Sequence, residues 1–162
     1  MKTAIYPGTF DPITLGHIDV IKKSLKVFDR VVVATTDSVH KNYFFSIEER
    51  ISIINNSLFK DLKLNKNKIK VIAFDTLTIN LCKKFNATVI IRGLRAVSDF
   101  EYEFQLAGMN KKLNSTIETM FLMSDVENQI ISSKFVKEIG KLGGNINKFV
   151  TKSTVKMLKN KL

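Results

Sequence analysis

The 162-residue sequence lacks the features that mark secreted and membrane proteins. It has one cysteine, Cys82, so no disulfide can form within the chain, and a reducing compartment is expected. No apolar run approaches the ~20 residues that cross a bilayer. Lys2 is followed by a short strand-like run and not by the extended apolar segment of a secretory signal. These absences predict a soluble, cytoplasmic protein with no membrane partner.

Several catalytic motifs are absent as well. The chain has no G-x-x-x-x-G-K-[ST] loop, no G-x-G-x-x-G after its first predicted strand, and no serine or cysteine in a nucleophile elbow. Neither His17 nor His40 has a cysteine or carboxylate at metal-ligand spacing, so no metal site built from protein ligands is expected, and His40 is interpreted as a loop residue. Kinase, dehydrogenase and hydrolase functions are therefore disfavoured.

Acidic residues are few, with 15 against 26 basic residues and a formal charge of +11. Such a charge fits a nucleic-acid-binding module, because Lys and Arg neutralise phosphates. The basic residues are spread along the chain, however, with local groups at 22–23, 60–70 and 148–161, and aromatic residues are not interleaved with them. We therefore interpret most of this charge as solvated surface and expect no nucleic-acid partner.

Apolar runs of strand length alternate with helical patterns throughout residues 1–162, which are expected to form one domain. Strands are predicted over Thr3–Tyr6, Arg30–Thr36, Lys68–Phe74, Ala87–Ile91 and Thr119–Met123. Capping boxes at Ser46–Glu49 and Ser98–Glu101 start helices that end near Phe59 and Leu113, and a C-terminal helical segment covers about residues 132–162. The order predicts a Rossmann-like α/β fold, a parallel five-stranded sheet with helices on both faces and a ligand site at the carboxyl ends of its strands.

The segment after the first predicted strand is the most informative part of the chain. It reads Gly8-Thr9-Phe10-Asp11-Pro12, then Thr14-Leu15-Gly16-His17 at the start of a helical pattern. A tight loop that opens a helix presents unpaired backbone N–H groups and the positive end of the helix dipole, which stabilise a bound polyanion. His17 would add a donor to a phosphate oxygen. Alternatively, Gly8 only shapes a turn, and His17 is a first-turn residue hydrogen-bonded to the backbone.

Two arginines around a glycine follow the fourth predicted strand, in Ile91-Arg92-Gly93-Leu94-Arg95. Forked guanidinium donors suit phosphate, and glycine lets a ligand approach the backbone closely. The alternative is that both arginines are surface charges paired with nearby acids, namely Asp99, Glu101 or Glu103.

Two further loops after strands carry candidate phosphate ligands. Lys41, in the loop after the second strand, supplies a movable positive charge, although a lysine in such a loop is commonly only solvated. Ser132 and Ser133 place hydroxyls at the start of a helix, where they bind phosphate or simply cap the helix. All of these groups are expected at one edge of the sheet.

Together, these motifs closely resemble those of the bacterial phosphopantetheine adenylyltransferases, a family of the nucleotidyltransferase α/β superfamily. The Gly16-His17 and Ile131-Ser132-Ser133 elements mark the superfamily, whereas Arg92-Gly93-Leu94-Arg95 with Asp99-Phe100-Glu101-Tyr102-Glu103 is more specific to the family. The resemblance implies reversible transfer of AMP from ATP to 4′-phosphopantetheine, which gives dephospho-coenzyme A and pyrophosphate in the penultimate step of coenzyme A synthesis. It also implies Mg²⁺ held mainly by the ATP phosphates, a homohexamer, and feedback by coenzyme A.

Roles for individual residues follow from the same resemblance. His17, Lys41 and Arg92 would be catalytic, and His17 would hydrogen-bond the α-phosphate. Thr9 would contact both substrates. The acceptor would be bound by Thr9, Lys41, Thr78 and Arg92. With Thr9 and His17, the nucleotide would be bound by Phe10, Gly93, Leu94, Arg95, Glu103, Asn128, Gln129, Ile130, Ile131, Ser132, Ser133 and Lys134.

The chain departs from the family pattern in two segments. The family usually has Ser-Lys-Lys-Pro where this chain has His40-Lys41-Asn42-Tyr43, and an aromatic residue and a third serine where Asn128 and Lys134 stand. The nearest alternative function is that of a sister nucleotidyltransferase acting on nicotinamide mononucleotide or glycerol phosphate. The Arg92-Gly93-Leu94-Arg95 segment argues against it.

Overall fold

Five parallel strands form one sheet in the computed structural model, which describes residues 1–38, 41–95 and 97–162. In spatial order, the strands are β3 (Ile69–Phe74), β2 (Arg30–Thr36), β1 (Thr3–Gly8), β4 (Val89–Leu94) and β5 (Glu118–Met123). The predicted Rossmann-like parallel sheet is therefore confirmed. The strand order reverses at β1, and in such sheets a ligand binds beyond the carboxyl ends of the strands at this point.

The fourth strand lies two to three residues later than predicted. The pattern predicts Ala87–Ile91 with Arg92 after the strand, but β4 runs from Val89 to Leu94. Its pairing with β5 extends to Leu94, whereas its pairing with β1 covers two residues. Arg92 thus belongs to the strand, and the sheet itself fixes its backbone.

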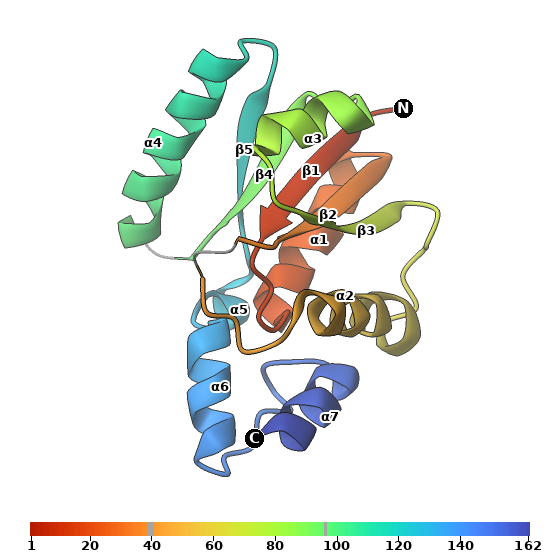
Figure 1. Cartoon of the computed structure of the whole chain (residues 1–162), viewed down its shortest axis with the longest axis vertical. Helices are drawn as coiled ribbons and strands as arrows, with labels where there is room; N and C mark the ends of the chain where they lie inside the picture. Colours follow the sequence, from red (N-terminus) through yellow and green to blue (C-terminus); the bar gives the residue numbers. More distant parts are fainter. Residues whose placement is uncertain (39–40, 96) are drawn as a thin grey trace.

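Helices cover both faces of the sheet, as predicted (Figure 1). One face carries α1 (Leu15–Val27) and α2 (Ile47–Asn55), which continues into the π-helix η1 (Asn56–Asp61). The other face carries α3 (Thr78–Phe85) and α4 (Val97–Leu113). Right-handed crossovers between parallel strands require this division once the strand order reverses at β1.

Side chains that alternate along the strands build one core on each face. In β2, Val31 and Val33 pack with α1 and α2, whereas Val32 and Ala34 pack with α3. Cys82 of α3 lies in the second core, and burial raises the pKa of its thiol to about 11. No helix in the described parts of the chain is long and apolar enough to span a bilayer.

The two predicted capping boxes have different outcomes. The first is confirmed, since the Ser46 hydroxyl accepts from the Glu49 N–H at 3.2 Å and the Glu49 carboxylate accepts from the Ser46 N–H at 2.8 Å. The second is wrong in position, because α4 begins at Val97 and Ser98 already lies within the helix. Asp99 lies in the first turn of α4, where the helix dipole favours an acidic residue. This interaction favours a helix that begins before Ser98.

Three helices lie beyond the carboxyl ends of the strands, below the sheet in Figure 1. They are α5 (Val126–Gln129), α6 (Ser133–Lys141) and α7 (Lys152–Lys161), so the predicted C-terminal helices are present. The described C-terminal end lies close to α6 and α7 and far from the N-terminus (Figure 1).

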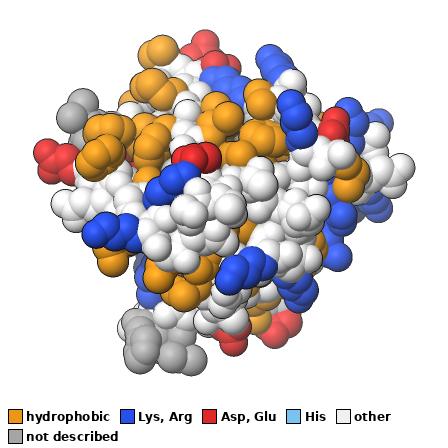
Figure 2. All heavy atoms as spheres, turned by 90° about the horizontal axis from the view of Figure 1, so that it is seen from above, with side chains coloured by type: hydrophobic (Ala, Val, Ile, Leu, Met, Phe, Trp, Pro, Cys, Tyr) orange, Lys and Arg blue, Asp and Glu red, His pale blue; other side chains and the backbone are white. Residues whose placement is uncertain are grey.

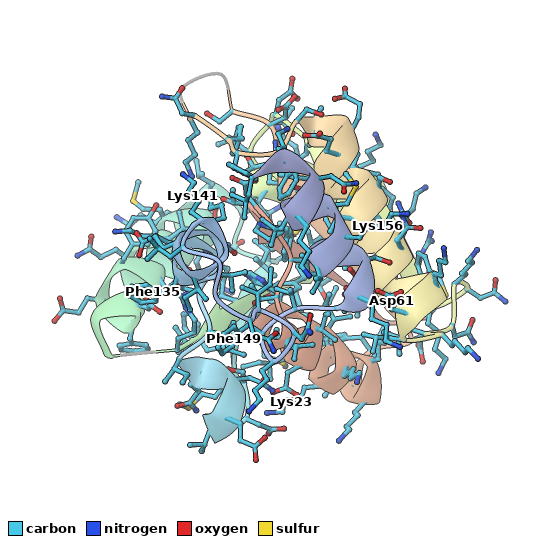
Figure 3. All side chains as sticks on the ribbon, turned by 90° about the horizontal axis from the view of Figure 1, so that it is seen from below. Lys23, Asp61, Phe135, Lys141, Phe149 and Lys156 are labelled. Atoms are coloured by element: carbon cyan, nitrogen blue, oxygen red, sulfur yellow. The ribbon has the colours of Figure 1, made fainter. Side chains whose placement is uncertain are left out.

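Contacts of Asp61 and Phe149, both labelled in Figure 3, help to attach the C-terminal helices to the rest of the fold. The Asp61 carboxylate accepts from the backbone N–H and hydroxyl of Ser153 at 2.7 and 2.9 Å. The Phe149 carbonyl accepts from the Leu15 N–H at 2.9 Å, at the first residue of α1. These contacts hold the C-terminal helices against the elements that carry the candidate site.

Candidate active site

A cavity of about 740 Å³ opens at the carboxyl ends of the strands, where the strand order predicts a ligand site. Most of the predicted site residues line it. They are Thr9, Phe10, His17, Lys41, Arg92, Gly93, Leu94, Arg95, Glu103, Ile131, Ser132, Ser133 and Lys134. The fold therefore brings together segments separated by more than 100 positions in the sequence, and the volume suits a ligand of nucleotide size.

Four predicted site residues do not line this cavity: Thr78, Asn128, Gln129 and Ile130. Thr78 is the first residue of α3, and Ile130 is 79% exposed. Asn128 and Gln129 support the site from α5. A Cβ at Gly16 would lie 3.0 Å from the Asn128 carbonyl oxygen, so α1 begins in close contact with α5. Roles of these four residues in ligand binding stay predictions.

The loop between β1 and α1 is shaped by contact between Gly8 and Phe10. The Phe10 ring lies so close that a Cβ at Gly8 would be 2.7 Å from it, and Phe10 takes a positive φ of 48°. Phe10 is 1% exposed and packs edge-on against His17, with ring centroids 5.1 Å apart. The loop is thus held by apolar packing below the cavity, and only glycine at position 8 allows that packing.

His17 is held in one tautomer by the start of α1. Its Nδ1 accepts from the Thr14 backbone N–H at 3.0 Å, so the neutral ring carries its proton on Nε2. Burial, and to a lesser extent the Arg95 charge, lower the pKa of His17 to about 4. His17 is therefore a neutral donor at physiological pH. The alternative, a first-turn histidine bonded to backbone, is confirmed, and the role of His17 as a phosphate donor through Nε2 stays a prediction.

Arg92 and Arg95 each pair with an acid of α4. Arg92 donates from Nε and Nη2 to the two carboxylate oxygens of Glu103 at 2.6 and 2.5 Å, and from Nη1 to the Pro7 carbonyl at 3.1 Å. Arg95 pairs with Asp99 at 3.3 Å. This is the pairing that the alternative interpretation of the arginines predicts, yet both side chains line the cavity. Glu103, predicted to bind nucleotide, is engaged by Arg92 and orients that guanidinium.

The loop before α2, residues 41–46, is pinned although it lacks the family's proline. The Tyr43 hydroxyl accepts from the Ser38 N–H at 2.9 Å, and its ring lies 3.9 Å from the guanidinium carbon of Arg50. Asp11 accepts from the N–H groups of Phe44 and Phe45 at 2.8 and 2.9 Å. Lys41, which lines the cavity, thus begins an anchored loop. His40 lies outside the described residues.

Arg50 connects this loop to the β1–α1 loop, and no sequence motif predicted its role. It is fully buried, and its guanidinium donates to the carbonyls of Thr9, Thr36 and Phe45 at 3.0, 2.7 and 3.2 Å. A sequence signal exists, because Arg50 shares the apolar face of α2 with residues three and four positions later. A charge on such a face indicates a buried network.

The start of α6 closes the cavity on another side. The Ser132 hydroxyl accepts from the Phe135 N–H at 3.1 Å, so the capping interpretation is confirmed, and the Ser133 hydroxyl donates to the Pro12 carbonyl at 2.8 Å. Lys134 lies in the first turn, where the helix dipole disfavours a cation and a bound anion relieves that cost.

The charges around the cavity suit a polyanion. Five cationic side chains and three carboxylates line it, and each carboxylate has a cationic partner: Asp11 with Lys137, Asp99 with Arg95, and Glu103 with Arg92. Lys41 and Lys134 have no acidic partner among the described residues. No group of three or more His, Cys, Asp or Glu side chains suited to a metal ion occurs in the described parts of the chain. A divalent cation at this site would rely on oxygen atoms of the ligand.

Comparisons with known proteins agree with this geometry. Residues 5–139 match the model of the cytidylyltransferase-like family. A phosphopantetheine adenylyltransferase of Pelagibacter ubique (strain HTCC1062) is 66% identical over 160 residues, which cover 99% of this chain and 98% of the relative. One of Roseobacter denitrificans (strain ATCC 33942 / OCh 114) is 46% identical over 162 residues, which cover 100% and 98%.

A solved structure shares the fold. It is that of a candidate nicotinate-nucleotide adenylyltransferase from Vibrio parahaemolyticus, with a TM-score of 0.69 and 20% identity over 98% of this chain and 99% of that chain. At this identity the likeness concerns the fold alone, whereas the 66% and 46% identities extend over whole chains. On these findings the chain belongs to the phosphopantetheine adenylyltransferase family.

Proposed function

We propose that the cavity transfers AMP from ATP to 4′-phosphopantetheine, reversibly, with release of pyrophosphate and formation of dephospho-coenzyme A. The observation that carries this proposal is the convergence of Thr9, His17, Lys41 and Arg92 on one cationic cavity at the strand-order reversal. The family's members are named for this acceptor, and full-length identity supports the same substrate here.

The reaction needs positioning and charge neutralisation more than proton transfer. A phosphate oxygen of the acceptor forms a bond to the α-phosphorus of ATP while the bond to the β-phosphate oxygen breaks and pyrophosphate leaves. The acceptor phosphate is already ionised at neutral pH, so no general base is required. The cavity agrees with this chemistry, because its three carboxylates are engaged by cations and its histidine is neutral.

Each side chain then has a defined part. His17 donates from Nε2 to an α-phosphate oxygen as charge develops there. Lys41, after β2, and Arg92, in β4, hold the acceptor phosphate between them, Arg92 with its guanidinium already oriented by Glu103. The backbone N–H groups at the start of α6, with Lys134, face the leaving pyrophosphate. Thr9 lies between the two substrates.

Magnesium would enter with the nucleotide. The protein offers it no unpaired carboxylate in the described cavity, and Mg²⁺ keeps several waters and prefers phosphate oxygens. Its contribution when bound would be to neutralise charge on the phosphates of ATP.

Assembly into a homohexamer in the cytoplasm completes the proposal. The exposed apolar side chains of α4 support an assembly, since Phe100, Tyr102, Phe104, Met109 and Leu113 are 42–66% exposed. Apolar side chains gather on the face of the molecule shown in Figure 2. Monomers rarely expose extended apolar patches, so copies of the chain are expected to cover this one.

The test is pyrophosphate release from ATP and magnesium with 4′-phosphopantetheine, compared with unphosphorylated pantetheine, nicotinamide mononucleotide and glycerol 3-phosphate. Of these four acceptors, we expect only 4′-phosphopantetheine to support pyrophosphate release. Release with another acceptor would assign the chain to a sister activity, and release with pantetheine would contradict the role given to Lys41 and Arg92. Light scattering during gel filtration tests the hexamer in the same preparation.

A further inference from the structure

One buried polar atom of the described structure has no partner. The Ser124 hydroxyl makes no hydrogen bond, and the residue is 4% exposed. An unpaired buried hydroxyl lowers stability, because the group has given up water without a replacement. Native proteins leave few such groups, and each one needs an explanation such as a ligand.

Ser124 lines the candidate active-site cavity, directly after β5. The strand order spreads the site along the edge of the sheet: Lys41 follows β2, His17 follows β1, Arg95 follows β4 and Ser124 follows β5. With Lys41 after β2 and the reacting phosphate at His17 after β1, Ser124 after β5 lies on the opposite side of the reaction centre from Lys41.

The chemistry of the surroundings distinguishes the parts of ATP. A triphosphate is matched by cations and helix N–H groups, which the start of α6 supplies at Lys134. A neutral hydroxyl is instead matched to groups that both donate and accept, such as the base edge or the ribose hydroxyls of a nucleoside. Leu94 and Ile131 line the same cavity and supply apolar surface for such a moiety.

The backbone around Ser124 is fixed on both sides, so the hydroxyl is preorganised. Its carbonyl accepts from the Gln129 side-chain amide at 3.0 Å, and the next residue, Asp125, donates its N–H to Asp19 at 2.5 Å. Lys23, labelled in Figure 3, pairs with Asp125 at 2.7 Å and ties this segment to α1. Binding a ligand here requires little further ordering of the protein.

We propose that Ser124 hydrogen-bonds the nucleoside of ATP, through the base edge or a ribose hydroxyl. The inference rests on the proposed function in that the cavity binds ATP, and it adds a binding residue that no family motif assigned.

The experiment is calorimetric titration of the full-length protein with the non-reacting analogue α,β-methylene-ATP, without any acceptor. Ser124→Ala is expected to weaken affinity by about tenfold, the effect of one hydrogen bond, while the melting temperature of the free protein stays equal or rises. The matched control is Ser24→Ala. That serine is also fully buried, but its hydroxyl donates to the Val20 carbonyl at 2.7 Å, so the change should lower the melting temperature and leave affinity unaltered.

Further arms identify the contact. The affinity of Ser124→Ala is compared with that of wild type for each analogue. If the variant binds the adenosine analogue more weakly but binds its inosine counterpart as well as wild type does, Ser124 contacts the base edge. If the difference is absent instead with the 2′-deoxy counterpart, Ser124 contacts the ribose. Equal affinity of wild type and Ser124→Ala would overturn the inference, as would an equal loss for inorganic triphosphate, which has no nucleoside. Wild-type protein that binds the analogue yet releases no pyrophosphate with 4′-phosphopantetheine would refute the proposed function alone, whereas absence of analogue binding would refute both.

Discussion

Substitutions at His17 separate its two roles, because the ring caps α1 through Nδ1 and offers a donor to the cavity through Nε2. Gln and Glu have nearly the same shape, and both complete a capping box at this position of a helix. They differ in the group presented to the phosphate: Gln retains an N–H donor, whereas Glu presents only acceptors and a negative charge. His17→Ala removes both roles.

The expected orders of stability and activity therefore differ, because Glu should be more stable than Ala but less active. Loss of one donor to a developing oxyanion lowers kcat by about 10²–10³, so the kcat of His17→Ala should fall by that factor. The kcat of His17→Gln should fall by less, and that of His17→Glu by more. Loss of the cap in His17→Ala should cost about 1 kcal/mol, or roughly 2–4 °C in melting temperature for a chain of this length, while Gln and Glu keep it. Steady-state pyrophosphate release and thermal unfolding measure the two quantities. If kcat followed the stability order, with Glu equal to Gln and above Ala, His17 would be a structural cap only.

The pH dependence of stability provides a second check on the same residue. The pKa of His17 is about 4 when folded, against an ordinary value of 6.5. Between these values the unfolded chain binds a proton that the folded chain does not, so the stabilising contribution is complete above pH 6.5 and is lost as pH falls toward 4. The slope is about 1 kcal/mol per pH unit. Urea unfolding at pH 7, 6 and 5 should show a shallower decline for His17→Gln than for wild type, and parallel declines would contradict a neutral buried ring.

Three further predictions concern the Lys41 loop, the buried Arg50 network and the core around Cys82. Tyr43→Ala should raise the KM for 4′-phosphopantetheine by about fivefold to tenfold, leave the KM for ATP unchanged, and speed tryptic cleavage after Lys41. The reason is that ring stacking and the hydrogen bond to Ser38 each contribute about 1 kcal/mol to holding the loop. Equal changes in both KM values would refute this. Arg50→Lys keeps the charge but loses the forked donors, so unfolding in urea should show a loss of about 2–4 kcal/mol, and a loss under 1 kcal/mol would show that the buried network contributes little. Cys82 should react with a thiol reagent at pH 8 about 100-fold more slowly in the folded protein than in guanidinium, since burial raises its pKa to about 11. Similar rates in the two conditions would show that α3 opens readily.

Much of the fold followed from local patterns. The five strands were predicted because apolar periodicity reports which side chains face a core, and the Ser46 capping box because its partners are three residues apart. The predicted bounds are wrong where contacts with distant segments determine where an element begins or ends. β4 extends to Leu94 because β5 continues beside it, and α4 starts at Val97, one residue before the predicted capping serine.

The candidate site divides in the same way. Thr9, His17, Lys41, Arg92 and the 132–134 segment were identified because a family's phosphate-binding residues lie in short contiguous motifs. The sequence pattern alone predicted no role for Asp11 within its motif, nor for Tyr43 at the position of the missing proline. Both now have one, as anchors of the loop that carries Lys41.

The sequence by itself determined the class of fold, the family and the residue types that line the candidate phosphate site, because each depends on residues close together in the chain. Only the tertiary structure decided which polar groups are buried and with what partners. Arg50 is buried at the centre of a hydrogen-bond network and Glu103 pairs with Arg92, whereas the buried Ser124 hydroxyl has no partner among the described residues. Burial and pairing depend on contacts between segments far apart in the chain, and no local pattern specifies which distant groups a fold will bring together.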